Sequence, residues 1–572
     1  MKKFLLLLFA LAIVAIRGWQ LYIGKRRIAI LFGAILIIQA FLLTSCVSPS
    51  PETSSNYAVP EAKTPAPYTT GANTQQQPAL QKPADTNNAP PSEGPLRIGL
   101  REAILLAMEN NQSLIVERMN PQITRTFEQE ELAIFEPVLD ANASSRRAIA
   151  DRLSPAGSGI ESSTMDSVTG LISLSKLFPT GTTVAIEGST GYTDSSLYSD
   201  TLTANRLGLT VTQALLQGFD VCANLARVNQ ARLDTLISQY ELRGFTEILL
   251  EEVESKFWDY VVAQRQIEIY TSSLNLAEKQ MTEIQERIKL GDLAKSELAA
   301  AQAEVALRRE NLINARSTLA KEHLELLRLM NPSRSIDWNR DVILEYDTAL
   351  PNVKLDNVNQ HVEVALRMRP DLNQARLQIQ RGDLEVVKTK NGLLPKMDVF
   401  ISFGKTGYAE TFSRSSENVG GDSYDVVFGL MFQEALPNRA ARAQHSRAVI
   451  SRQQLHKALE NLSQLVEVDV RSAYIEVTGA REQIAATAAT RNFQEEKLRV
   501  ETEKFRVGKS TSLLVGQAQR DFVTSQIAEI EALANYLKAL VWLYRLEGSL
   551  LERRGIAGPG REPVKLSDMP GH

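Results

Sequence analysis

Cysteine and histidine are scarce in this chain of 572 residues. The two cysteines, Cys46 and Cys222, lie far apart, so they provide neither a disulfide framework nor the closely spaced ligands of a metal site. The five histidines are scattered. An excess of charge of one sign is also lacking, because 63 Lys and Arg residues oppose 67 Asp and Glu residues and the net charge is −4. This balance gives no electrostatic reason to expect a nucleic acid as partner.

Catalytic motifs are missing as well. The tripeptide Gly-Lys-Ser at residues 508–510 has the form of the end of a phosphate-binding loop, but the glycine required five residues upstream is replaced by Glu503. No His-Glu-x-x-His motif occurs, and His445 and His456 have no acidic or cysteine partner at ligand spacing. We therefore expect no enzyme activity, no cofactor and no metal site.

Proline is absent from two long stretches, residues 180–331 and 438–558. A proline inside a helix costs about 3 kcal/mol, so its absence permits very long helices. In the second stretch, apolar residues recur every three or four positions and mark one face of a helix. They are Leu455, Leu459, Leu462, Val466, Val470, Ala473, Val477, Ala480 and Ile484. We predict helices over residues 100–135, 220–288, 293–330, 358–392, 438–505 and 511–551, of which the helix over 438–505 would be about 100 Å long.

The N-terminus is typical of a targeting segment. Residues 24–27 are Gly-Lys-Arg-Arg, and an almost unbroken apolar run follows over 28–43. The run ends in Leu-Thr-Ser-Cys, which resembles a bacterial lipobox and implies cleavage before Cys46 and acylation of its thiol. Several acyl chains anchor durably, because each buried CH₂ contributes about 0.8 kcal/mol. The alternative is a transmembrane helix with an incidental cysteine. Residues 46–95 are rich in Pro, Ser, Thr, Gln and Asn, which predicts a flexible tether.

The rest of the chain contains an internal repeat. Residues 107–114 match residues 365–372, and residues 137–140 match 395–398 at the same spacing of 258 residues. Later landmarks also recur, including Leu290-Gly291 and Val507-Gly508. The predicted organisation is a signal segment (1–45), a lipid-anchored linker (46–95), a first repeat (96–331), an inter-repeat segment (332–357), a second repeat (358–553) and a C-terminal tail (554–572).

Alternating patterns within each repeat predict β-strands. In the second repeat Val399, Ile401 and Phe403 share one face, residues 424–432 alternate in the same way, and a polar loop over 407–422 separates them. Strands of about 9–11 residues are long enough to cross a membrane. The first repeat has matching strands around 183–186 and 207–211. An extra alternating piece at 171–177 predicts an additional hairpin there. The alternative is a soluble β-sandwich.

Together these landmarks resemble the TolC-like outer membrane factors over residues 96–553. The residues that carry the resemblance are Leu100, Ala107, Asn110, Asn111, Pro137, Pro395, Leu290, Gly291, Val507 and Gly508. The resemblance implies an α+β membrane protein that forms a homotrimer in the outer membrane, with a large periplasmic portion. Each subunit would add four strands to a twelve-stranded β-barrel, continuous with a periplasmic α-helical barrel.

The resemblance also implies partners at the periplasmic tip. The turns containing Leu290, Gly291, Val507 and Gly508 would contact a periplasmic adaptor protein, which joins the duct to an inner-membrane pump. The alternative for the two glycines is a plain helix cap. Family members narrow the tube with acidic residues six and nine positions after the second tip glycine, but Leu514 and Gln517 occupy those positions here. Glu297, six positions after Gly291, is left as a weak gate candidate, with a solvated helix charge as the alternative.

These features predict a passive outer-membrane exit duct of a tripartite efflux or export system. A duct for type I protein secretion is one alternative. A lipid-anchored coiled-coil scaffold without a pore is the other.

Overall fold

The computed structural model describes residues 95–153, 159–196, 200–291, 293–331, 338–346 and 355–565. The chain divides into two units, Met1–Asp85 and Thr86–His572, and every described residue belongs to the second. The predicted signal segment at 1–45, the predicted lipidation site Cys46 and the predicted linker up to residue 94 lie outside the described residues.

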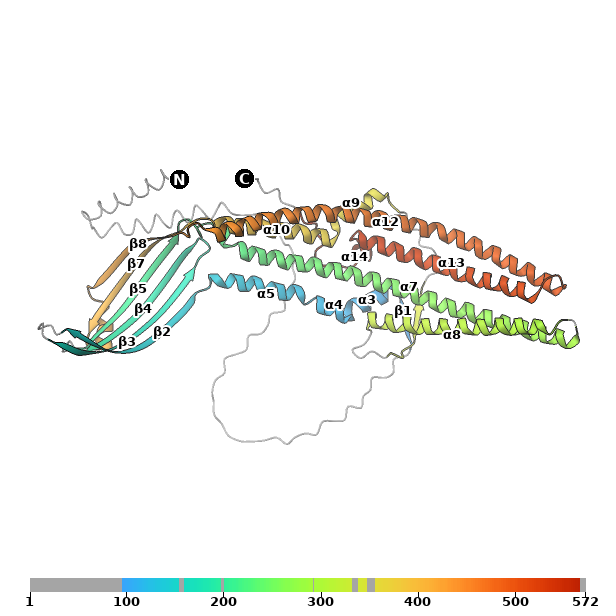
Figure 1. Cartoon of the computed structure of the whole chain (residues 1–572), viewed down its shortest axis with the longest axis horizontal. Coiled ribbons are helices and arrows are strands. Elements are labelled where there is room, and N and C mark those ends of the chain that lie inside the picture. Colours follow the sequence, from blue (N-terminus) through green and yellow to red (C-terminus); the bar gives the residue numbers. More distant parts are fainter. Residues whose placement is uncertain are drawn as a thin grey trace, which may run out of the picture. The chain divides into compact units, whose positions relative to one another are not determined.

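The second unit contains the same order of elements twice: helices, strands and a long helical hairpin (Figure 1). The first half has α3 (Leu100–Asn110), α4 (Gln112–Glu117), α5 (Asn120–Leu132), η1 (Ala133–Phe135), β2 (Val138–Leu153), β3 (Ile160–Leu177), β4 (Thr182–Ser195), β5 (Leu202–Ala214), α6 (Val221–Asn224), α7 (Ala226–Leu290) and α8 (Ser296–Met330). The second half has α9 (Val358–Met368), α10 (Pro370–Asn391), β7 (Lys396–Ala409), α11 (Phe412–Asn418), β8 (Tyr424–Gln433), α12 (Arg439–Arg506), α13 (Ser512–Leu546) and α14 (Leu550–Arg553). The predicted long hairpins are confirmed.

The predicted helices over 100–135 and 358–392 are each interrupted, and both breaks fall at equivalent positions of the repeat. Asn111 has an extended backbone, and its side chain accepts a hydrogen bond from the Leu114 N–H, which caps α4. Arg369 is also extended (φ −56°, ψ 127°), because Pro370 follows it and disfavours a helical conformation in the preceding residue.

The strands form one antiparallel sheet of six, in the order β2-β3-β4-β5-β7-β8. The expectation of four strands per chain is therefore wrong, whereas the suspected extra hairpin in the first half is confirmed. The sequence understates this sheet because β2 is rich in Ala, Ser and Arg, and most of β3 is rich in Ser and Thr, so neither alternates clearly. These strands are held by partners across the ladder rather than by a local pattern.

The helices lie side by side in a fixed order. Next to the sheet, α7 packs against α5 and α10, and α10 packs against α12, which gives the order α5-α7-α10-α12. Farther along, α7 packs against α8 and α13, and α13 packs against α12. Both hairpin turns lie at the end away from the sheet (Figure 1). None of the helices in the described ranges combines the length and apolar character needed to cross a bilayer.

The main apolar core lies midway along the helices. It includes the fully buried Phe257, Leu326, Leu327, Met330 and Leu543. A two-stranded parallel sheet adjoins it, in which β1 (Leu96–Gly99) pairs with β6 (Val342–Glu345). Because β6 comes from the predicted inter-repeat segment, this pairing attaches that segment to the start of the first half.

Candidate functional sites: a two-faced sheet, two turns and a central polar network

One face of the six-stranded sheet is apolar and exposed. Residues that face each other across the ladder form a continuous row through all six strands. This row, the apolar row, consists of Leu139, Leu174, Ile186, Leu209, Phe403 and Val426, and every member is exposed. Phe428, Leu430 and Phe432 of β8 lie on the same face and are exposed too. An exposed apolar surface of this extent is typical of a membrane or protein contact.

The opposite face is more polar, although Leu171, Val427 and Met431 are also exposed on it. Arg206 of β5 reaches across β7 and pairs with Asp425 of β8, with Nη2 and Oδ2 2.5 Å apart. The crossing passes over Gly404, where a Cβ atom would overlap the guanidinium group. Thr210 donates to Ser402 on the same face (3.0 Å). One face is thus suited to lipid and the other to water.

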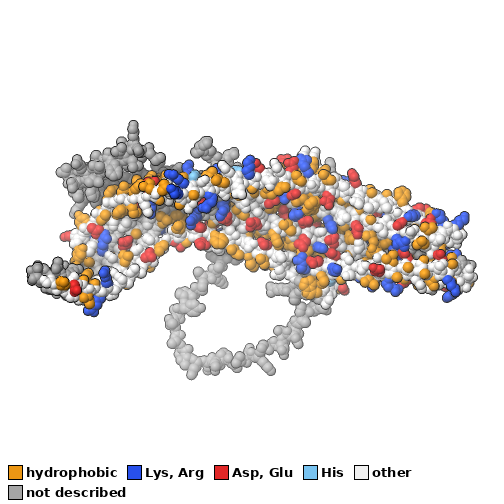
Figure 2. All heavy atoms as spheres, viewed as in Figure 1, with side chains coloured by type: hydrophobic (Ala, Val, Ile, Leu, Met, Phe, Trp, Pro, Cys, Tyr) orange, Lys and Arg blue, Asp and Glu red, His pale blue; other side chains and the backbone are white. Residues whose placement is uncertain are grey.

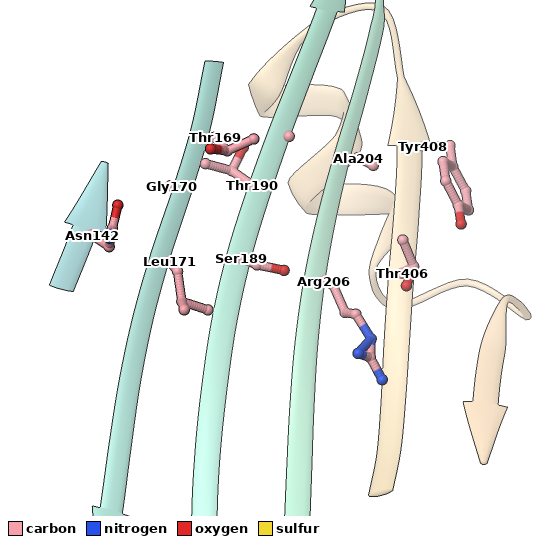
Figure 3. Close-up of a pocket in the computed structure, with 11 residues that line it drawn as sticks. Asn142, Thr169, Gly170, Leu171, Ser189, Thr190, Ala204, Arg206, Thr406 and Tyr408 are labelled. Carbon is pink, nitrogen blue, oxygen red and sulfur yellow. The ribbon is translucent and has the colours of Figure 1, made fainter. Parts of the chain in front are cut away.

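The polar face has a hollow that extends across five of its strands. The hollow has a volume of about 540 Å³, and residues of β2, β3, β4, β5 and β7 line it, among them Asn142, Ser189, Arg206 and Thr406 (Figure 3). Hydroxyl, amide and guanidinium groups line it together with Leu171, Ala204 and two glycines. It is an open, solvent-accessible hollow in the sheet rather than a closed ligand pocket.

Helix α11 covers the apolar face at the end of the sheet away from the long helices. The Asn205 backbone N–H donates to the Ser415 hydroxyl (3.0 Å), and this hydroxyl donates to the Gly407 carbonyl (2.7 Å). The predicted polar loop over 407–422 therefore holds three more residues of β7, 407–409, and this helix. Its seven residues are too few for a periodic apolar pattern, so the sequence carries no signal that marks it.

The two hairpin turns place glycine where only glycine fits easily. Gly291 has φ +86° and Gly508 has φ +73°, both in the left-handed region, while a Cβ atom at either position would meet nothing within 4 Å. Backbone conformation, not crowding, therefore requires glycine. Beside them, Leu290 is 77% exposed and Val507 is 68% exposed. Each turn presents an uncovered apolar side chain next to a glycine.

Glu297 lies between the turns rather than in open solvent. The Ser512 hydroxyl donates a hydrogen bond to its carboxylate, which connects the start of α8 to the start of α13. Leu514 and Gln517 are exposed on α13. Deeper in the hairpins, Glu304 of α8 pairs with Arg308 (2.5 Å) and with Arg520 of α13 (2.6 Å). Burial lowers the pKa of Arg308.

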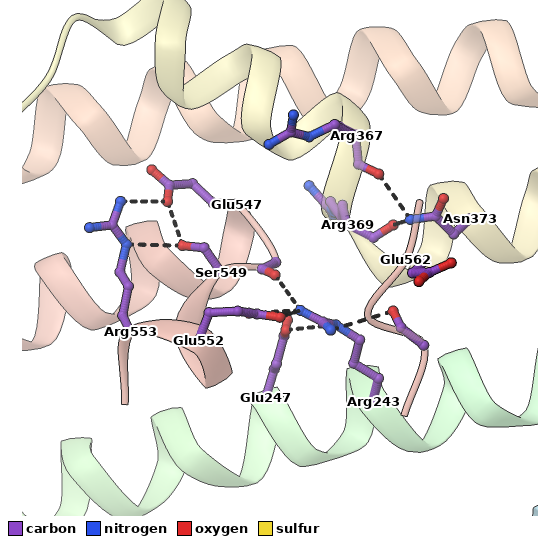
Figure 4. A network of polar contacts seen from close by, with 12 residues as sticks. Arg243, Glu247, Arg367, Arg369, Asn373, Glu547, Ser549, Glu552, Arg553 and Glu562 are labelled. Carbon is purple, nitrogen blue, oxygen red and sulfur yellow. Dashed lines mark hydrogen bonds and ion pairs between the residues drawn. The ribbon is translucent and has the colours of Figure 1, made fainter. Parts of the chain in front are cut away.

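A buried polar network lies midway along the helices (Figure 4). Arg243 of α7 is fully buried, and its Nη2 donates to the Gly548 carbonyl (2.8 Å) and to the Glu552 carboxylate (2.8 Å and 2.9 Å). Its Nε lies 3.2 Å from Oε1 of Glu247. Burial raises the pKa of Glu247 to about 8, against the opposing charge of Arg243. Sequence reasoning missed this network, because its members are separated by about 300 residues.

The C-terminal segment is held at the same level. The Tyr240 hydroxyl donates to the Glu562 carbonyl, and the Val564 N–H donates to Asn373 (2.9 Å). The described part of the predicted tail, up to residue 565, thus packs on α7 and α10. Next to this segment, His361 of α9 contacts Glu547 inside the core, and burial lowers the pKa of this histidine.

The residues singled out for chemistry do not converge. His445 lies near the Thr389 hydroxyl (3.2 Å), and Cys222 is half-buried in α6. Across the described ranges, no cluster of three or more His, Cys, Asp or Glu residues is arranged to hold a metal ion.

The fold agrees with the comparisons to known proteins. The family model described as outer membrane efflux protein matches residues 362–549. None of the curated proteins compared with the chain matches it in sequence. The chain is similar to this family in sequence over those residues, and its fold is that of the TolC-like outer membrane channels. The resemblance drawn from the sequence motifs is confirmed.

Three solved structures illustrate the likeness. A membrane protein from Pseudomonas aeruginosa superposes with a TM-score of 0.60 at 19% identity, covering 78% of this chain and 93% of that one. The CmeC outer membrane channel of Campylobacter jejuni gives 0.58 at 14% identity, covering 79% and 86%. The outer membrane protein VceC of Vibrio cholerae gives 0.58 at 14% identity, covering 78% and 96%.

Proposed function

We propose that the chain is one subunit of a homotrimeric, passive exit duct in the outer membrane, belonging to a tripartite efflux or export system. One observation carries the proposal: a sheet with an exposed apolar face and a polar face continues directly into helices of 65 and 68 residues. Such helices are about 100 Å long, which suits a tube that leads away from the membrane. The domain match to outer membrane efflux proteins supports the same function.

Exposed apolar residues along the edges of the helical layer support assembly. On α12, Ile450, Val468, Ile475 and Phe493 are exposed and lie close to whole turns apart, so they form one line, the α12 stripe. The other edge of the layer carries exposed Met119, Ile123 and Phe127, the α5 stripe. Two complementary edges on one chain favour a ring of identical subunits.

The hairpin turns are the proposed docking point for a periplasmic adaptor and, through it, an inner-membrane pump. Leu290 and Val507 offer apolar contacts, and Gly291 and Gly508 keep the adjacent backbone accessible. We expect Leu290→Asp and Val507→Asp to weaken co-purification of the adaptor, whereas Leu324→Asp, an exposed site away from the turns, should leave it unchanged.

Cys46 is the proposed lipidation site. Its acyl chains would anchor the start of the mature chain in the membrane. Mass spectrometry of the N-terminal peptide tests this directly. A mass increase that accounts for the acyl groups supports the anchor, and an unmodified cysteine on a chain that retains residues 1–45 contradicts it.

A planar-bilayer recording of the purified protein tests the duct. We expect discrete conductance steps that rise in Ser512→Ala, which lacks the hydrogen bond to Glu297 between the two hairpins. Absence of conductance in the native protein and in this variant would sink the proposal.

The two alternatives have different tests. A scaffold without a pore would leave residues 396–434 open to protease along their whole length in intact outer membranes, whereas a membrane sheet would be cut only in its outer loops. A duct for type I protein secretion would have the same fold, so neighbouring genes for the pump and adaptor discriminate it from small-molecule efflux.

A further inference from the structure

We propose that β2 of one chain pairs with β8 of the next, so that three chains close a barrel of eighteen strands instead of twelve. This inference rests on the proposed trimeric duct and deepens it. It starts from the six-stranded sheet, which has two strands more than the family resemblance implies.

The two edge strands are oriented to meet. Within the described residues, β2 pairs only with β3, and β8 pairs only with β7, so each has one unpaired side. Strand β2 starts at Val138, just after the helices, and β8 ends at Gln433, just before α12. They therefore run in opposite directions relative to the helices, as an antiparallel pair requires. In lipid, unpaired backbone groups cost several kcal/mol each, so both edges must be covered.

The apolar row reaches both edges of the sheet. It begins at Leu139 on β2 and ends at Val426 on β8, and both side chains are exposed. A neighbouring copy would place the apolar face of its β2 beside the apolar face of β8 and complete an apolar band around the barrel. If β2 were left out of the barrel, its exposed apolar residues Leu139 and Ala141 would have no lipid to contact.

The sizes of the side chains on the two edges are complementary. On the apolar face β2 presents the small residues Ala141 and Ala143, whereas β8 presents Phe428, Leu430 and Phe432. Large side chains on one strand pack well over small ones on its neighbour. Two copies of β8, or two copies of β2, would not match in this way, which favours a head-to-tail ring.

The helices also favour a contact between the β2 edge of one chain and the β8 edge of the next. The strands β2 and β8 join α5 and α12, which are the two edges of the helical layer beside the sheet. The α5 stripe and the α12 stripe are the exposed apolar lines on those helices. A single neighbouring chain can thus cover both the helical edge and the sheet edge.

Two additional strands per chain widen only the membrane part. The helical layer keeps four helices beside the sheet, but the barrel circumference scales with strand number, so at equal tilt it becomes about 1.5 times that of a twelve-stranded barrel. The membrane exit would then be wider than the family pattern implies, and the narrow part of the duct would lie in the helical portion.

Cysteine cross-linking tests the pairing. In a Cys222→Ser background that keeps Cys46, Ala141→Cys is combined in turn with cysteine at Tyr424, Val426, Phe428, Leu430 and Phe432, which are the apolar-face positions of β8. Copper-phenanthroline oxidation in outer-membrane vesicles should produce covalent dimers and trimers for one or two adjacent positions. Each single-cysteine chain should stay monomeric on the gel. So should Ala141→Cys combined with Leu207→Cys, because β5 is an inner strand.

Native mass spectrometry of the detergent-extracted protein gives the number of chains. A trimer with cross-linked edges supports eighteen strands. A dimer with cross-linked edges overturns the inference in favour of a twelve-stranded barrel. An intact trimer that conducts in bilayers but forms no cross-link at any of the five positions also overturns it, while leaving the duct in place. A protein that neither inserts nor conducts refutes the duct and this inference together.

Discussion

Replacing Arg243 with methionine tests the role of the central polar network. The side chain is fully buried on α7 and connects this helix to the segment after α13, through the Gly548 carbonyl and Glu552. Methionine keeps much of the volume and the unbranched shape, but it removes every hydrogen bond. The carbonyls of Gly548 and Gly560 and the carboxyl groups of Glu247 and Glu552 would lose their shared partner.

The expected cost follows from the contacts. Removing one member of a buried ion pair costs about 3–5 kcal/mol, because the remaining charge is left uncompensated. Two features place the cost of Arg243→Met at the lower end of this range. The side chain of Glu552 is 31% exposed and can turn towards water. Glu247, whose pKa is raised to about 8 by burial, can take up a proton. We therefore expect a loss of about 3 kcal/mol, shared between α7 and the C-terminal segment.

Limited proteolysis measures this loss locally. When opening is fast, cleavage follows the population of the open form, so 3 kcal/mol corresponds to about a hundredfold faster trypsin cleavage at Arg553, Arg554 and Arg561. The matched control is Arg227→Met, since Arg227 is exposed on the same helix. Adding Glu552→Gln to Arg243→Met should slow the cleavage again, because it removes one uncompensated carboxylate.

Two results would refute this reasoning. Cleavage in Arg243→Met that is less than threefold faster than in Arg227→Met would mean that the network does not hold the C-terminal segment. A double variant that is cleaved faster than Arg243→Met would mean that Glu552 stabilises the segment through another contact.

Three further outcomes are expected. Gly291→Ala should cost about 1–2 kcal/mol from its left-handed backbone alone, and Gly548→Ala should cost more because its Cβ would lie 2.9 Å from the Arg369 Cα; urea unfolding compares them, and equal losses contradict the crowding. Because the folded-state pKa of Glu247 is raised to about 8, its protonation stabilises the fold at low pH, and this stability is lost as the pH rises from the unfolded pKa to about 8. Melting temperatures from pH 5 to pH 9 should therefore depend less on pH in Glu247→Gln, and an unchanged slope would contradict this. Phe428→Arg should prevent membrane insertion at a cost of about 2–4 kcal/mol, whereas Val427→Arg on the polar face should insert and conduct; equal insertion of both would contradict the assignment of faces.

The confirmed predictions came from patterns that repeat over long stretches. The absence of proline and the apolar period predicted both hairpins, and glycine after Leu290 and after Val507 predicted their turns. Elements that are short, or that lack a regular apolar pattern, were not predicted. Strand β2 has no clear alternation, α11 has only seven residues, and the break at Arg369 depends on one proline within an otherwise helical pattern. The domain boundaries and the roles of the turn residues are still predictions.

By itself, the sequence determined the long helices, the glycine turns and the alternation of β7 and β8, because each depends on residues close together in the chain. It also determined the repeat, because two similar segments can be matched by their residues alone. Only the tertiary structure decided the number of strands, the pairing of Arg243 with residues about 300 positions away, and the contact of Glu297 with Ser512. These features arise from segments that are distant in sequence, and no local period records which of them become neighbours. The same distinction applies to the sheet edges, since β2 and β8 become complementary only once six strands lie in one layer.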